Sequence, residues 1–104
     1  IAADGATLNE RRRMSWYGLI SVAFALGAND KLLGSPEIRL HGVPIEEDLD
    51  DFIDEATVAA VKAIKDNRGD YEKLRESVRL AVRRVAVSWT GKKPIVDVMI
   101  LETA

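Results

Sequence analysis

One histidine, His41, is the first residue to consider for catalytic chemistry in this chain of 104 residues. A hydrolytic metal centre or a proton shuttle needs a second histidine or converging carboxylates, and none sits at ligand spacing along the segment around His41. The chain has no cysteine, so thiolate zinc sites and disulfide frameworks are excluded. We predict a surface or structural role for His41, with no catalytic, cofactor-binding or metal-ligating residue in this chain.

Acidic residues are concentrated around the start of a predicted helix, at Glu46, Glu47, Asp48, Asp50 and Asp51. Carboxylates suit hard cations, but this segment lacks the glycine and the terminal bidentate glutamate of a calcium loop. A helix start is the simpler explanation, because acids in the first turn meet the positive end of the helix dipole. We therefore expect Asp48 to be the N-cap of a helix and not a metal ligand.

Basic residues are concentrated elsewhere, since residues 79–93 hold five bases and no acid whereas 46–55 hold seven acids and no base. These bases are the candidate RNA contacts, and binding through phosphates would weaken steeply with salt. The same residues also fit a solvated helix face, and the net charge of only −2 gives no overall attraction to nucleic acid. The candidates are Arg79, Arg83, Arg84, Lys92 and Lys93.

The helix that carries these arginines is predicted from its boundaries and its periodicity. Asp70 is a suitable N-cap because its carboxylate can accept a bond from a first-turn amide, and Gly91 tolerates the left-handed turn that ends many helices. Between them, apolar residues recur at helical spacing. They are Tyr71, Leu74, Val78, Ala81, Val82, Val85 and Trp89. We expect Trp89 to lie in the core and to close this helix against a sheet.

Alternating apolar residues predict two strands earlier in the chain. The first strand covers 16–26, and a shorter second strand covers 37–43. A turn at 27–30 and a connection through 34–36 would join them as an antiparallel ribbon.

A first helix at about 49–67 and a last strand at 95–101 complete the pattern. Only a short turn separates the two helices, so they must lie roughly antiparallel. Pro94 ends the helical region and precedes the last strand. The order β-β-α-α-β predicts an α/β (α+β) fold of two layers, in which two helices cover one face of a three-stranded sheet.

Length and composition fit one domain, since 47% of the residues are hydrophobic. We interpret residues 1–13 as a linker remnant and residues 14–104 as the domain. The chain begins with Ile, which suggests a piece of something larger. No apolar run is long enough to span a membrane, and the lack of cysteine fits a reducing compartment, so we expect a cytoplasmic protein with no membrane partner.

The second face of the predicted sheet is more apolar than a monomer usually exposes. It would carry Leu19, Ala23, Ala25, Met99 and Leu101 beside Ser21, Arg39 and Asp97. We interpret Leu19, Ala23, Met99 and Leu101 as a possible interface with another domain or a second copy of the chain.

Three groups of residues resemble one known family. The first is Arg12-Arg13-Met14-Ser15-Trp16-Tyr17-Gly18 at the start of a strand. The second comprises Pro36-Glu37-Ile38, Gly42 on the second strand, the acidic helix, and Leu74, Val78, Ala81 and Arg84 on the last helix. The third and most specific is Thr90-Gly91-Lys92-Lys93-Pro94 before an apolar strand that ends at Glu102. Together they cover about residues 11–102 and resemble the C-terminal domain of ribonuclease J, although Asp97 departs from the apolar pattern of the last strand.

The resemblance implies a piece of a metal-dependent ribonuclease with a metallo-β-lactamase and β-CASP body. In that family a zinc pair activates water against RNA, giving 5′-to-3′ exonuclease and endonuclease activity in RNA maturation and decay. The family's HxHxDH motif is absent here, so no catalytic residue carries over. The resemblance implies instead that this domain helps the parent enzyme to assemble into dimers or tetramers and supports its activity on RNA.

Three functions therefore remain open at this point. The chain could be an assembly module, a direct RNA-binding module, or an unrelated α/β adaptor or small-ligand domain. Aromatic stacking platforms are missing from the basic surface, because Tyr71 and Trp89 fall on the predicted core stripe. Assembly is the interpretation that the second sheet face favours.

Overall fold

The structure is a computed structural model that describes residues 17–103. The sequence interpretation of residues 1–13 as a linker lies outside this range. Within it, the chain forms the two-layer β-β-α-α-β fold that the sequence predicts.

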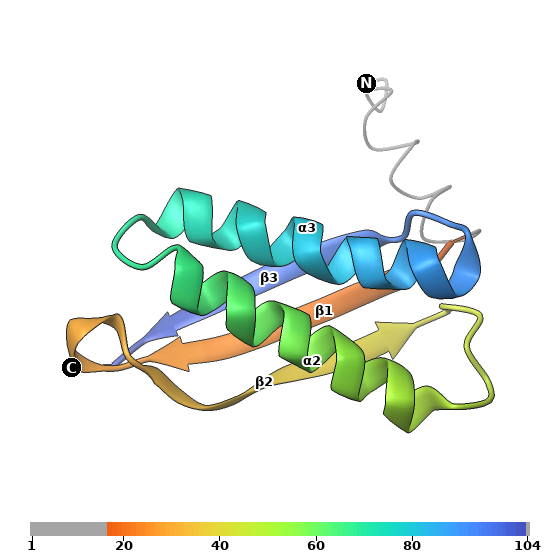
Figure 1. Cartoon of the computed structure of the whole chain (residues 1–104), viewed down its shortest axis with the longest axis horizontal. Coiled ribbons are helices and arrows are strands. Elements are labelled where there is room, and N and C mark those ends of the chain that lie inside the picture. Colours follow the sequence, from red (N-terminus) through yellow and green to blue (C-terminus); the bar gives the residue numbers. More distant parts are fainter. Residues whose placement is uncertain (1–16, 104) are drawn as a thin grey trace, which may run out of the picture.

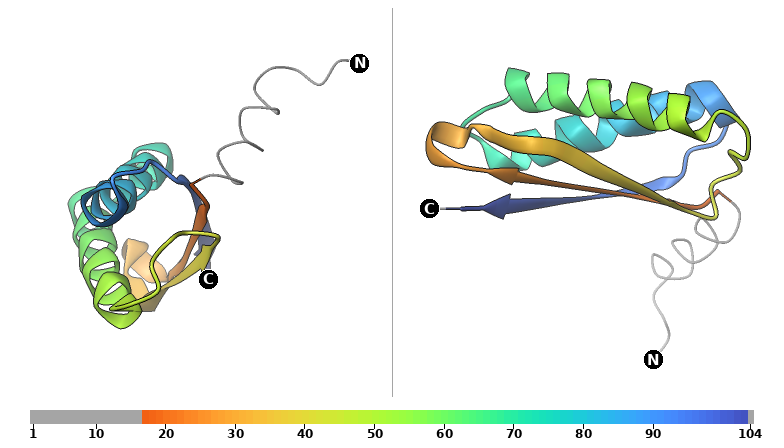
Figure 2. Two further views of the ribbon diagram at one scale, coloured as in Figure 1. Left: turned by 90° about the vertical axis from the view of Figure 1, so that its right-hand side faces the viewer. Right: turned by 90° about the horizontal axis from the view of Figure 1, so that it is seen from below.

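The sheet has the strand order β2-β1-β3, with β1 (Leu19–Leu26) in the centre. β2 (Leu32–His41) pairs with β1 in antiparallel orientation, and β3 (Ile95–Glu102) pairs with β1 in parallel orientation. Helices α2 (Leu49–Asp66) and α3 (Tyr71–Thr90) follow β2 in the chain and lie together on one face of the sheet, as Figures 1 and 2 show. The other face of the sheet has no layer over it among the described residues.

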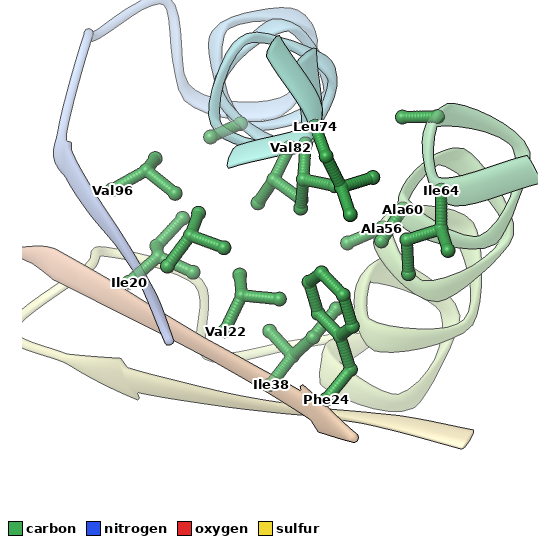
Figure 3. Packing of buried hydrophobic residues seen from close by; sticks show 14 of the residues in the cluster. Ile20, Val22, Phe24, Ile38, Ala56, Ala60, Ile64, Leu74, Val82 and Val96 are labelled. Carbon is green, nitrogen blue, oxygen red and sulfur yellow. The ribbon is translucent and has the colours of Figure 1, made fainter. Parts of the chain in front are cut away.

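The core lies between the sheet and the two helices, where alternate residues of the strands meet the apolar stripes of the helices (Figure 3). The inward residues of β1 are at most 3% exposed. Each such aliphatic or aromatic side chain stabilises the fold by about 1.5–3 kcal/mol when it is buried. The α2 helix presents small residues to the core, which let it pack closely. These residues are Ala56, Ala60 and Ala63.

The first turn between strands differs from a simple hairpin. Asn29 and Asp30 both have positive φ angles, of 57° and 56°, in a short 3-10 segment η1 (Ala28–Asp30). The Tyr71 hydroxyl donates a hydrogen bond of 3.0 Å to Asp30 Oδ1, which ties this turn to the start of α3. The bond to the Asp30 carboxylate raises the pKa of Tyr71 above its usual value.

The beginning of β1 requires a glycine. Gly18 has a φ of +86°, and a Cβ atom on it would lie 2.7 Å from the backbone of Gly42 and Val43. Only glycine combines this backbone angle with so close an approach between chain segments. Gly18 therefore allows the start of β1 to lie directly beside the chain segment that follows β2.

The start of β2 lies earlier than the sequence predicts. The strand begins at Leu32 and not at Glu37, and residues 34–36 belong to it instead of forming a connection. The register with β1 shifts between Ala23 and Ala25, where Gly34 has a φ of +68°. Pro36 is tolerated because β2 is an edge strand.

The two predicted helix caps differ in outcome. The Asp70 carboxylate accepts hydrogen bonds from the backbone amides of Glu72 and Lys73, at 3.1 and 3.2 Å, as predicted. Asp48 is the N-cap residue of α2, as predicted, but its side chain accepts no capping bond. Asp48 has a left-handed backbone with a φ of 59°, whereas a side-chain cap needs an extended one.

Replacing Asp70 with alanine should lower the free energy of unfolding by about 1 kcal/mol, because two first-turn amides of α3 lose their acceptor. Urea denaturation measures this loss. The matched control is Asp70→Asn, whose side-chain oxygen can accept the same bonds and should retain most of the stability. An alanine variant as stable as the parent would show that this cap contributes nothing.

The prediction that Trp89 lies in the core is wrong. Trp89 is 37% exposed, and its ring lies edge-on to Phe52 of α2 with centroids 5.6 Å apart. Its indole N–H donates a hydrogen bond of 2.6 Å to Glu55 Oε2. Trp89 therefore joins the end of α3 to the beginning of α2 at the rim of the core and does not close the helix against the sheet.

Candidate interaction surfaces

The face of the sheet that points away from the helices is the first candidate surface, and we call it the open face. Strand register arranges its side chains in four rows, each with one residue from β2, β1 and β3 in that order. The rows are His41–Leu19–Ile95, Arg39–Ser21–Asp97, Glu37–Ala23–Met99 and Leu33–Ala25–Leu101.

Exposure on the two faces of β3 shows how strongly apolar the open face is. Val96 and Val98 point to the helices and are 5% and 7% exposed, whereas Met99 and Leu101 on the open face are 55% and 52% exposed. Leu33 on β2 is 44% exposed in the same row as Leu101. One end of the open face therefore leaves three large apolar side chains in solvent.

The structure places all four sequence-predicted interface residues, Leu19, Ala23, Met99 and Leu101, on the open face. Sequence reasoning missed Leu33, because it treated the residues before 37 as a connection. The available signal was the pair Leu32-Leu33 directly after the turn. In β2 that pair points one leucine to the helices and one to the open face.

The basic residues form a more divided surface. Arg79 Nε donates to Glu76 Oε2 at 2.8 Å, and a second bond from Arg79 Nη2 makes the pair bidentate. This pairing lowers the pKa of Glu76 and raises that of Arg79. Lys92 Nζ lies 5.7 Å from the centre of the Tyr17 ring. Both side chains already have partners within the chain.

Arg83 and Arg84 have no ion-pair partner in the described part of the chain. Both line a shallow hollow of about 210 Å³ with Leu80 and Val87, and Arg84 alone also lines the groove between α2 and α3. The five sequence-predicted RNA contacts are therefore divided: Arg83 and Arg84 share a hollow, whereas the other three lie apart from it. Arg79 is paired with Glu76, Lys92 lies over the Tyr17 ring, and Lys93 is exposed between α3 and β3.

His41 lies at the exposed end of β2, beside Leu19 of β1. Over residues 17–103 there is no group of three or more His, Asp or Glu side chains that could hold a metal ion. Among the same residues, no helix is both long and apolar enough to cross a membrane.

Comparison with known proteins shows the family of this chain, which the geometry of its surfaces alone does not reveal. The family model described as the ribonuclease J C-terminal domain matches residues 6–103. The chain belongs to this family. The sequence resemblance to the ribonuclease J C-terminal domain is therefore confirmed. In this chain the domain consists of β1, β2, α2, α3 and β3.

A curated relative agrees with the family match. The chain is 36% identical over 98 residues to a protein named Ribonuclease J from Sinorhizobium meliloti (strain Sm2011 / Rm2011 / 2011). The match covers 89% of this chain but only 17% of that relative. The chain therefore spans only about a sixth of the length of this relative, which is a much longer protein.

Proposed function

We propose that the chain is the non-catalytic C-terminal domain of a ribonuclease J-like enzyme and that it supports assembly of that enzyme through the open face. The observation that carries this proposal is the exposure of Leu33, Met99 and Leu101 on one sheet surface. A contiguous apolar surface of this kind is typical of interfaces. The partner is the rest of the parent enzyme or a second copy, within a homodimer or tetramer.

The activity that we propose for the parent enzyme is metal-dependent 5′-to-3′ exonucleolytic and endonucleolytic cleavage of RNA in RNA maturation and mRNA decay. The proposal rests on family membership and on the name of the relative. Zinc would be bound in the catalytic body, and RNA would be the substrate of that body. We further propose that the enzyme acts in the cytoplasm.

The test of the assembly role is sedimentation of the chain with Met99 and Leu101 changed to glutamate. The two side chains are exposed, so the fold should survive while association is lost. A variant that associates as the parent does would overturn the proposal.

Direct RNA binding is the competing proposal, and Arg83 and Arg84 are the residues to test because neither is engaged by a carboxylate in the described chain. Under the assembly proposal, changing both to glutamate leaves self-association unchanged, since both residues lie on α3 and not on the open face. Gel shifts at two salt concentrations measure RNA retention. Salt-sensitive RNA binding that these changes abolish, with normal association of the sheet-face variant, would favour RNA binding over assembly.

A further inference from the structure

Three neighbouring hollows lie on the side of α2 and α3 that faces away from the sheet (Figure 2). The first lies on α3, the second lies in the seam between α2 and α3, and the third lies on α2, with volumes of about 210, 300 and 410 Å³. Leu80 and Arg84 line both the first and the second hollow. Lys62 and Asp66 line both the second and the third. The three hollows therefore form one continuous surface across both helices, which we call the helix surface.

Positive charge dominates the helix surface. Lys62, Lys65 and Arg84 are exposed, and none of them forms an ion pair among residues 17–103. Arg83 adds a fourth cation, whereas Asp66 is the one acid that lines the three hollows. Electrostatic complementarity therefore selects a partner that brings negative charge.

Apolar side chains lie beside these cations. Val58 of α2 is 70% exposed, the largest value among the large hydrophobic residues of the described chain. Val61, Leu80 and Val87 are half-buried in the same hollows. An RNA backbone binds through its phosphates, which do not need apolar contacts, and no aromatic side chain lines these hollows to stack on a base. The combination of cations with valine and leucine favours an acidic protein segment over RNA.

The shape of the helix surface fits a helix. The helices α2 and α3 are joined by a turn of residues 67–70 and run side by side (Figure 1). Side chains of a third helix can pack into the seam between two such helices, at an interaxial distance of about 8–10 Å. Along α3 the first two hollows extend from Ser77 to Val87, which is about 15 Å at the helical rise per residue. An amphipathic helix of about ten residues matches that length.

We propose that the helix surface binds an acidic amphipathic helix of another protein. Carboxylates of the bound helix pair with Lys62 and Arg84 in the seam. Its apolar side chains pack against Val58 on one side and against Leu80 and Val87 on the other. The helix surface and the open face lie on opposite sides of the molecule (Figure 2), so this interaction goes beyond the proposed assembly function and does not depend on it.

The size of the contact sets the strength of binding to expect. A helix of about ten residues covers less than the roughly 800 Å² per partner of a standard interface. The complex should therefore be weak and transient, and titrations must extend to millimolar concentrations of the chain.

The probe for this proposal is a fluorescein-labelled synthetic helical peptide of about 14 residues, with leucines at i, i+3, i+4 and i+7 and glutamates on both sides of them. Fluorescence anisotropy at low salt measures its binding to the whole chain. One matched peptide has lysine in place of every glutamate and should not bind. A second has alanine in place of every leucine and should bind at least about fivefold more weakly, because the apolar contacts are lost.

Charge-reversal variants locate the binding site on the chain. Lys62→Glu/Arg84→Glu should weaken binding of the glutamate peptide at least about tenfold, because like charges then meet in the seam. Both residues are exposed, so the circular dichroism spectrum and melting temperature should change little. The matched control is Lys31→Glu/Lys93→Glu, which makes the same change in net charge at two exposed lysines that line none of the hollows. The control should bind the peptide as the parent does.

Arg83 stays unchanged in these variants because its charge already acts within the chain. The pKa of Glu76 is lowered by its hydrogen bond to Arg79 and further by the nearby charge of Arg83. The apolar part of the site is tested separately with Val58→Ser, which should weaken binding a few-fold without adding charge.

Three results would overturn the proposal. The first is a glutamate peptide that does not bind at millimolar concentration, and the second is one that binds both charge-reversal variants equally well. The third is an alanine peptide that binds as tightly as the leucine peptide, since the contact would then be purely ionic. A single-stranded oligouridine that binds in place of the glutamate peptide, and is lost in Lys62→Glu/Arg84→Glu, would show that the helix surface contacts RNA instead.

The sheet-face variant separates this proposal from the assembly proposal. Met99→Glu/Leu101→Glu leaves the helix surface unchanged and should bind the glutamate peptide as tightly as the parent does. Loss of peptide binding in this variant would contradict the assignment to the helix surface. Failure of self-association with normal peptide binding would contradict the assembly proposal alone.

Discussion

Replacing Phe52 with alanine should lower the free energy of unfolding by about 3–5 kcal/mol, the usual cost of removing a fully buried aromatic ring. Phe52 is 0% exposed and contacts Trp89 edge-to-face. Trp89→Ala should cost only about 1–2 kcal/mol, because the indole is 37% exposed and bonds a surface carboxylate. Urea denaturation of both variants gives the comparison.

The order of these two losses is the informative result. Trp89→Phe is the matched control, since it retains a ring beside Phe52 and loses the hydrogen bond to Glu55. It should fall between the parent and Trp89→Ala. If Trp89→Ala is destabilised more than Phe52→Ala, the result would contradict the rim position of Trp89 and support the core position that helical periodicity predicted.

Local signals in the sequence predicted α3 well. Asp70 and Gly91 mark its ends through backbone chemistry that acts within a few residues, and both have the conformations expected of caps. Trp89 fits the same periodicity but lies in the last turn. There it contacts Phe52 and Glu55 at the beginning of α2. Helical spacing tells which side of α3 a residue occupies and not which element covers that side.

Features that depend on distant pairing could not be predicted. Gly34 and Pro36 are typical of loops, yet they lie in β2 because an edge strand tolerates a proline and a register shift. The placement of β1 between β2 and β3 likewise depends on contacts far apart in the chain. Without that order, Arg39 and Asp97 could not be placed on either side of Ser21.

The apolar face of the sheet was predictable in part. Alternation along 95–101 identified Met99 and Leu101 as residues that point away from the helices, and the structure leaves both more than half exposed. Leu33 was missed with the start of β2. The grouping of the basic residues was less informative, because their spacing in the sequence did not reveal that Arg79 is paired with Glu76.

Changing Met99 and Leu101 to glutamate should weaken self-association at least a hundredfold. Association removes these side chains from water, and a buried carboxylate without a partner costs several kcal/mol. The changes leave the core residues Val96 and Val98 in place, so the melting temperature should change little.

The matched control for this pair is Val58→Glu. Val58 is an apolar residue of α2 that is 70% exposed, and it lies on the helix layer instead of the open face. The same chemical change at this position should leave both stability and association as they are in the parent. An equal loss of association in Val58→Glu would mean that added negative charge, and not its position, is responsible.

Sedimentation of the parent chain and of Met99→Glu/Leu101→Glu over a range of concentrations up to the millimolar level tests most directly whether the open face is an assembly surface. We predict that the parent passes from monomer to dimer with rising concentration, and that the double variant remains a folded monomer throughout. A double variant that dimerises at the same concentrations as the parent would contradict this account.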